Sequence, residues 1–127
     1  MLVLGIETSC DDTAAAVLLD GRTIELTPDV LVIADEKKIL GMAGVMGGED
    51  SGISDATSDV FLEVAYFDPE RIARTGQALA LASDARSRFE RGVDPAFLDD
   101  GLAILTGLIL DICGGEASRV VRAGGPP

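Results

Sequence analysis

Glu63 is the acidic residue whose position in the sequence points most directly to chemistry. It stands in the middle of an apolar run, residues 60–67 (VFLEVAYF), so its carboxyl group is expected to be partly buried. Burying a carboxylate costs free energy unless a charge or a hydrogen bond compensates it. The compensating group is either an arginine, such as Arg71, Arg88 or Arg91, or the hydroxyl group of a bound ligand. The sequence leaves both interpretations open.

The glycine-rich stretch 44–52 (GVMGGEDSG) is a second candidate feature. Glycine-rich loops cradle phosphates in many proteins, but this one matches neither G-x-x-x-x-G-K-[ST] nor G-x-G-x-x-G. In addition, Glu49 and Asp50 would repel a phosphate. We therefore favour a tight turn at which another segment of backbone approaches closely. The alternative is that this backbone forms one wall of a pocket.

Two further polar groups allow both a structural and a functional interpretation. Ser83 precedes Asp84 in a pattern typical of a helix N-cap, and it acts either only as a cap or as a cap that also faces a pocket. Asp11 and Asp12, followed by Thr13, resemble a turn that binds a metal or a phosphate. Adjacent acids point in different directions, so we favour a solvated turn.

The absence of histidine removes several classes of chemistry. Without it there is no Ser-His-Asp triad, no Cys-His pair and no imidazole metal site. The two cysteines, Cys10 and Cys113, form no C-x-x-C pair, so we expect neither a metal site nor a cofactor. Acid–base chemistry would then depend on Asp, Glu or Tyr66, or on a group of the substrate.

The charge of the chain bears on its partners. A formal net charge of −12 disfavours binding of nucleic acid by the isolated chain, because phosphates need Lys and Arg. We expect the one arginine cluster (Arg86, Arg88 and Arg91) to pair instead with Asp84, Glu90 and Asp94. The longest apolar stretch, 102–110, is too short to cross a bilayer, and no signal peptide is expected. A soluble, cytoplasmic protein without membrane contact is predicted.

The elements that must position these residues indicate an α+β fold. Alternating or β-branched runs predict a mixed or antiparallel sheet, and three capping signals predict the starts of two to three helices. The predicted strands lie at 2–7, 13–19, 22–26, 30–34, 39–43, 60–67 and 119–122, with a turn at Asp20-Gly21. The predicted helices begin at Asp68-Pro69 (to about Thr75-Gly76), Ser83-Asp84 (to Arg91) and Asp94-Pro95 (to Gly114-Gly115).

From Leu19 onward, six motifs occur in a characteristic order: LDG (19–21), LVIAD (31–35), AGVMGGEDSG (43–52), FLEVAYFDP (61–69), RFERGVDP (88–95) and ICGGEA (112–117). Their order and spacing resemble the B3/B4 domain of bacterial phenylalanyl-tRNA synthetase β subunits. The resemblance implies a β/β/α-like fold and an editing role, the hydrolysis of tyrosine wrongly attached to phenylalanine tRNA. By resemblance, Glu63 accepts the phenol hydroxyl group, and Gly47, Ser83 and Ala85 line the rest of the substrate site.

Residues 1–18 (MLVLGIETSCDDTAAAVL) resemble a different family, the enzymes that attach threonylcarbamoyl to adenosine in tRNA. The match covers only the first hairpin of that family, so no ATP-binding or transferase role follows from it. A chain that resembles two families in this way suggests a chimeric, recombined or designed protein. We expect one domain over 1–127, with a grafted hairpin (1–18), a B3/B4-like part (19–123) and a flexible tail (124–127).

Three hypotheses for function follow. The first is a stably folded B3/B4-like domain without catalytic activity of its own, because the family's domain brings a histidine to its site and this chain has none. The alternative is an editing hydrolase-like domain that binds or hydrolyses tyrosine mischarged on tRNA. The third is an interaction module, such as a homodimer formed through an exposed sheet edge.

Overall fold

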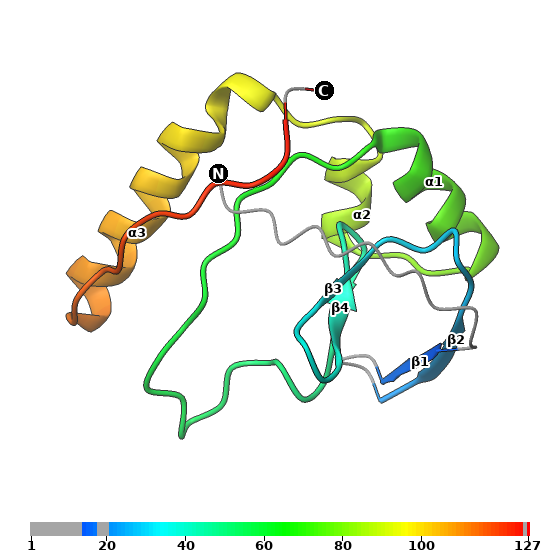
Figure 1. The fold of residues 1–127 in the computed structure, drawn as a ribbon, viewed down its shortest axis with the longest axis horizontal. Coiled ribbons are helices and arrows are strands. Elements are labelled where there is room, and N and C mark those ends of the chain that lie inside the picture. The colour runs from blue at the N-terminus through cyan, green and yellow to red at the C-terminus, as the bar shows by residue number, and fades with distance from the viewer. Residues whose placement is uncertain (1–13, 18–20, 126) are drawn as a thin grey trace.

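The computed structural model describes residues 14–17, 21–125 and 127, and it has the predicted α+β fold (Figure 1). Short strands come first along the chain and helices follow. The described elements are β1 (Ala14–Val17), β2 (Thr23–Leu26), β3 (Val32–Ala34), β4 (Ile39–Met42), β5 (Met46–Gly47), α1 (Pro69–Ala78), α2 (Asp84–Phe89), the 3-10 turn η1 (Pro95–Phe97) and α3 (Leu98–Cys113).

The strands form two small antiparallel sheets. β1 pairs with β2 from Ala14 opposite Leu26 to Val17 opposite Thr23, and β3, β4 and β5 form a three-stranded meander. Gly21 has a φ of +79°, in keeping with the predicted turn before β2. The predicted strand at 13–19 is thus confirmed over its middle part, whereas the one at 2–7 lies outside the described residues.

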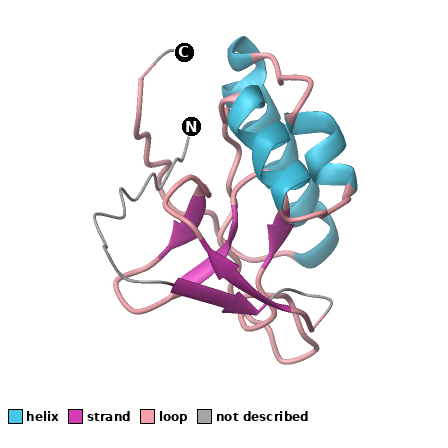
Figure 2. Cartoon of the chain, turned by 90° about the vertical axis from the view of Figure 1, so that its right-hand side faces the viewer, coloured by secondary structure: helices cyan, strands magenta, loops and turns pink. Residues whose placement is uncertain are grey.

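α1 and α2 lie on one side of the strands (Figure 2) and contribute Ile72 and the partly buried Phe89 to the core, whereas α3 lies apart from the strands (Figure 1). The core is aliphatic, as the low aromatic content predicts, with Ile72 and Leu81 almost fully buried. One aromatic pair extends it, because the rings of Phe67 and Phe89 lie 5.2 Å apart and are tilted by 47°. The buried cluster comprises Leu26, Val30, Val32, Met42, Ala43, Val45, Ala65, Phe67, Ile72 and Leu81.

The predicted helix signals are confirmed. Each cap side chain accepts a hydrogen bond from a backbone N–H of the first helical turn, which satisfies a group that the helix itself leaves unpaired. A left-handed glycine, Gly114 (φ +72°), ends α3 as predicted. The capping bonds are Glu70 N–H to Asp68 (3.0 Å), Arg86 N–H to Ser83 (3.0 Å) and Ala96 N–H to Asp94 (2.9 Å).

Two predicted strands are wrong. Residues 60–67 and residues 119–122 belong to no strand. Strand propensity reflects packing against neighbours on a pleated surface, and no described strand pairs with either segment to supply that surface. Within 60–67, Ala65 and Phe67 are nevertheless buried as the alternation predicts, whereas Phe61 is 64% exposed.

The predicted strands at 22–26, 30–34 and 39–43 are each one or two residues shorter in the structure, and two helix ends also differ from the prediction. α1 extends past Gly76 to Ala78, and α2 ends at Phe89 rather than at Arg91. In the part of the chain that the structure describes, no helix has the length and apolar character needed to cross a membrane.

Candidate functional site

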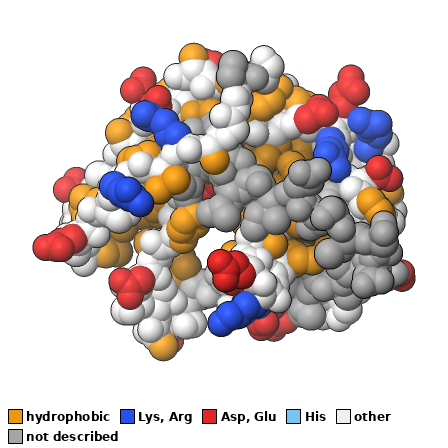
Figure 3. Space-filling model, viewed as in Figure 1, with side chains coloured by type: hydrophobic (Ala, Val, Ile, Leu, Met, Phe, Trp, Pro, Cys, Tyr) orange, Lys and Arg blue, Asp and Glu red, His pale blue; other side chains and the backbone are white. Residues whose placement is uncertain are grey.

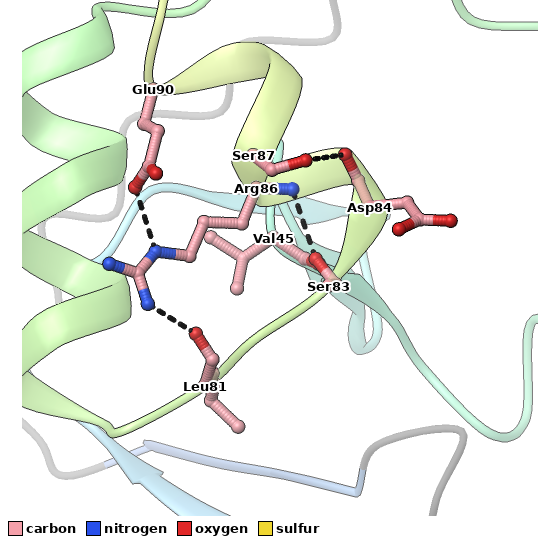
Figure 4. A network of polar contacts seen from close by, with 7 residues as sticks. All are labelled: Val45, Leu81, Ser83, Asp84, Arg86, Ser87 and Glu90. Atoms are coloured by element: carbon pink, nitrogen blue, oxygen red, sulfur yellow. Dashed lines mark hydrogen bonds and ion pairs between the residues drawn. The ribbon is translucent and has the colours of Figure 1, made fainter.

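Ser83 joins the start of α2 to the glycine-rich loop. Its Oγ accepts the capping hydrogen bond from Arg86 N–H and donates a short hydrogen bond to the backbone oxygen of Val45 (Figure 4). The predicted cap is therefore confirmed, and the hydroxyl group of Ser83 donates its proton to a backbone group of the protein rather than to a ligand. Because Val45 lies two positions before Gly47, this bond attaches the glycine-rich loop to the start of α2.

The glycine-rich loop is a place of close backbone and side-chain approach, as the favoured interpretation predicts. A Cβ atom on Gly44, which has a φ of +67°, would lie 2.9 Å from Cδ1 of Ile72. Gly48 donates its N–H to the backbone oxygen of Leu40 at 2.8 Å, and an added Cβ there would meet the same oxygen at 2.5 Å. Gly47, between them, is exposed and pairs with Gly41 in the sheet.

Arg86 packs onto α1. Its Nη1 donates to the backbone oxygen of Leu81 (2.6 Å), and its Nε donates to Oε2 of Glu90 (2.9 Å). The guanidinium group lies where a side chain on Gly76 would be, since a Cβ on that glycine would come within 2.1 Å of Nε. Arg86 thus ties the end of α1 to α2.

The arginine pairing predicted from the sequence is only partly confirmed. The Arg86–Glu90 ion pair is present, with both side chains largely covered. Within the described residues, no ion pair joins Arg88 or Arg91 to Asp84 or Asp94. Arg88 and Arg91 lie on the surface, where water solvates their charge and a fixed pair gains little.

Glu63 is half-buried, as its apolar neighbours predict. Burial raises the pKa of Glu63 from 4.5 to about 7, because removal from water disfavours the charged carboxylate. The interpretation that an arginine compensates it is wrong, since no hydrogen bond or ion pair connects Glu63 to any described residue. Arg71, one of the three candidates, donates instead to the backbone oxygens of Asp29 (2.9 Å) and Pro28 (3.3 Å).

No described hydrogen bond joins any two of the four residues predicted to line the site. Ser83 is bonded into the loop that contains Gly47, and Ala85 is half-buried in the first turn of α2. Glu63 lies two positions before Ala65, which belongs to the same buried cluster as Val45. No described hydrogen bond joins Glu63 to the other three. No group of three or more His, Cys, Asp or Glu side chains that could hold a metal occurs in the described residues.

Gly76 is the residue of this region that sequence reasoning missed. Its position suggested the end of a helix, whereas it lies inside α1 and is buried beneath Arg86. A glycine within an otherwise amphipathic helix is a signal of close packing, and that signal was available at this position.

Comparison with known proteins gives a consistent result. Residues 7–114 match the family model of the B3/4 domain. The chain is 69% identical over 109 residues to the phenylalanine–tRNA ligase beta subunit of Novosphingobium aromaticivorans. The identity is 57% to the protein of the same name from Cereibacter sphaeroides and 55% to that from Paramagnetospirillum magneticum. Each of these alignments covers 86% of this chain but only 14% of the relative.

The family match begins within the stretch 1–18, whose separate origin stays a prediction. The motifs from Leu19 onward and the capped helices fall inside the matched residues 7–114. Because this match spans most of the sequence, the chain belongs to the B3/4 domain family.

Proposed function

We propose that this chain is the amino-acid-recognition part of an editing domain, which binds a tyrosine-like ligand through Glu63 and does not hydrolyse an ester by itself. This proposal rests on the burial of the Glu63 carboxyl group and on its lack of a hydrogen-bond donor among the described residues. Its carboxyl group is half-buried, and no described residue donates a hydrogen bond to it. A ligand hydroxyl group would supply the missing donor.

A carboxylate in this state discriminates tyrosine from phenylalanine. The phenol hydroxyl of tyrosine donates a hydrogen bond to the Glu63 carboxylate and stabilises its charge. Phenylalanine would cover the same carboxylate without offering a donor, and a buried group left unpaired weakens binding strongly. The small residues Gly47 and Ala85 would leave room for a ring, and Ser83 would position the loop.

This chain alone offers no suitable general base for hydrolysis of an aminoacyl ester. The chain has no histidine, and the Ser83 hydroxyl is already engaged with Val45 and Arg86. Glu63 would be occupied by the phenol group of the ligand. Ester cleavage would therefore need a hydroxyl group of the substrate or groups from outside the 127 residues. A cytoplasmic location, where thiols stay reduced and tRNA is charged, is part of the same proposal.

The test compares tyrosine amide with phenylalanine amide by titration calorimetry on the whole chain. We expect tyrosine amide to bind about tenfold or more tightly, since a hydrogen bond to a charged group contributes roughly 1.5–3 kcal/mol. Glu63→Ala should remove the preference, whereas Glu49→Ala, an exposed acid in the glycine-rich loop, should leave it intact. Equal binding of the two amides would contradict the recognition role.

A second measurement addresses catalysis. Release of tyrosine from mischarged phenylalanine tRNA should equal the rate in buffer alone. Release that is faster than in buffer, and lost in Glu63→Ala, would contradict the non-catalytic half of the proposal and favour the editing-hydrolase alternative.

A further inference from the structure

Phe61 is an exposed aromatic residue that shares one face of an extended segment with Glu63. Residues 57–68 contain no turn or bend. In an extended chain, side chains two positions apart point to the same side and are separated by roughly 6.6 Å. Phe61, Glu63, Ala65 and Phe67 therefore lie in one row. Exposure falls along this row, because Phe61 is 64% exposed, Glu63 is half-buried and the last two are buried. The row thus runs from the surface into the core, with Glu63 at the boundary.

The two sides of this segment lie against different parts of the molecule. Phe67 lies beside the glycine-rich loop, since a Cβ added to Gly44 would be 3.2 Å from its Cδ2. Val64 points the other way, toward α3, where a Cβ added to Gly101 would be 3.7 Å from its Cγ1. The side that carries Glu63 is therefore the one turned toward the glycine-rich loop. Figure 3 shows the molecule hollowed between the segment that joins β5 to α1 and the β3–β4 hairpin, with hydrophobic atoms on the rim.

We infer that Phe61 is the surface against which the aromatic ring of the ligand stacks, an inference that rests on the proposed function of Glu63. A single exposed phenylalanine is common on protein surfaces and by itself indicates nothing. Here, however, it lies one repeat of the extended chain away from the group that would accept the phenol hydroxyl. A ligand that bonds to Glu63 and extends toward the surface would bring its ring alongside Phe61. The two ring centroids would then lie within the range of about 4.5–7 Å that aromatic pairs prefer.

The two side chains would contribute to recognition in different ways. The carboxylate of Glu63 bonds only to a hydroxyl group, so it separates tyrosine from phenylalanine. The ring of Phe61 attracts any aromatic ring, whatever its substituent. Phe61 would therefore set the affinity for aromatic amino acids as a class, and Glu63 would select within that class. Serine, which offers a hydroxyl group but no ring, would be excluded.

Titration calorimetry of the whole chain with tyrosine amide and phenylalanine amide tests this inference. Phe61→Ala should weaken the binding of both amides by about three- to tenfold and leave the ratio of the two dissociation constants unchanged. Phe61→Tyr keeps an aromatic ring and should retain the wild-type affinity. The matched control is Val60→Ala, which shortens an apolar side chain that is 47% exposed and points to the opposite side. It should bind both amides as the wild type does.

Two further measurements separate stacking from a structural role. Because Phe61 is largely exposed, its replacement by alanine should leave the unfolding midpoint unchanged. Intermolecular nuclear Overhauser effects should join the ring protons of bound tyrosine amide to those of Phe61. Serine amide should show no binding in the same titration.

The outcomes distinguish this inference from the proposed function. A Phe61→Ala variant that binds both amides as tightly as the wild type, while Glu63→Ala still removes the preference for tyrosine, would overturn the role of Phe61 alone. Binding of serine amide as tight as that of tyrosine amide would also overturn it. Equal binding of tyrosine amide and phenylalanine amide by the wild type, or no binding of either, would contradict the recognition role of Glu63 and this inference with it.

Discussion

The guanidinium group of Arg86 occupies the space that a side chain on Gly76 would need. Nε of Arg86 lies 2.1 Å from the position of an ideal Cβ on Gly76, while Nη1 holds the backbone oxygen of Leu81. The arginine is held from its other side by Glu90. This arrangement sets how α1 and α2 pack, and through Ser83 it also sets where the glycine-rich loop lies.

Gly76→Ala should destabilise the protein, although alanine is normally the better helix former by about 1 kcal/mol. The new methyl group would force Arg86 away from Leu81 and Glu90, at an expected net cost of about 2–3 kcal/mol. Urea unfolding at low protein concentration measures the change. Gly107→Ala, where nothing lies within 4 Å, is the control and should stabilise the chain slightly. A stabilising Gly76→Ala would show that Arg86 does not lie against α1 in solution.

Ser83→Ala should cost about 1–2 kcal/mol of unfolding free energy, because it removes the helix cap and also the bond to Val45. Ser87→Ala provides the comparison on the same helix. Its hydroxyl group donates only to the exposed backbone oxygen of Asp84, so the loss should be within about 0.5 kcal/mol. Equal losses at the two serines would argue against the special role of Ser83 in joining α2 to the loop.

Gly44→Ala should be costly for two separable reasons. The residue has a positive φ of +67°, and its Cβ would lie 2.9 Å from Ile72. Gly21→Ala isolates the first reason, because Gly21 also has a positive φ of +79° but nothing within 4 Å. We expect about 1 kcal/mol for Gly21→Ala and about 2–4 kcal/mol for Gly44→Ala, measured by denaturant unfolding. Similar losses of unfolding free energy for the two variants would mean that the core side chains beside Gly44 rearrange to accommodate a methyl group at little cost.

Glu63 should make stability depend on pH in the direction opposite to most carboxylates. Its pKa is raised from 4.5 to about 7 in the folded protein, so the folded state holds this proton more tightly than the unfolded state. Its contribution is therefore most favourable below the unfolded pKa, and it is lost as pH rises from about 4.5 through about 7. Because Glu63 is only half-buried, we expect on the order of 1–2 kcal/mol after solvent screening is allowed for.

The comparison of wild type with Glu63→Gln measures this effect, since glutamine resembles the protonated acid and cannot ionise. The two proteins should have similar unfolding free energies at about pH 4, and the variant should be the more stable at about pH 8. Titration of the many other acids is common to both proteins and cancels in the difference. A difference that does not change with pH would mean that Glu63 is solvated in the folded state.

Features that depend on residues close together in sequence were predictable. The helix caps at Asp68, Ser83 and Asp94 could be predicted because each capping hydrogen bond joins residues only two or three positions apart. The close approach at the glycine-rich loop followed from glycine's conformational freedom, and Gly44 does have a positive φ. The strand predicted at 60–67 failed for the opposite reason, since a ladder needs a second strand that no local pattern guarantees.

By itself, the sequence determined the α+β class and the starts of the helices. It also excluded imidazole chemistry, and its ordered motifs indicated membership of the B3/4 domain family. Only the tertiary structure decided that Glu63 bonds to no described residue and that Arg86 lies against Gly76. It alone also revealed that half of α3 remains uncovered. Propensity and capping act over one helical turn, whereas the burial of a charge or of a helix face depends on residues brought together from distant parts of the chain.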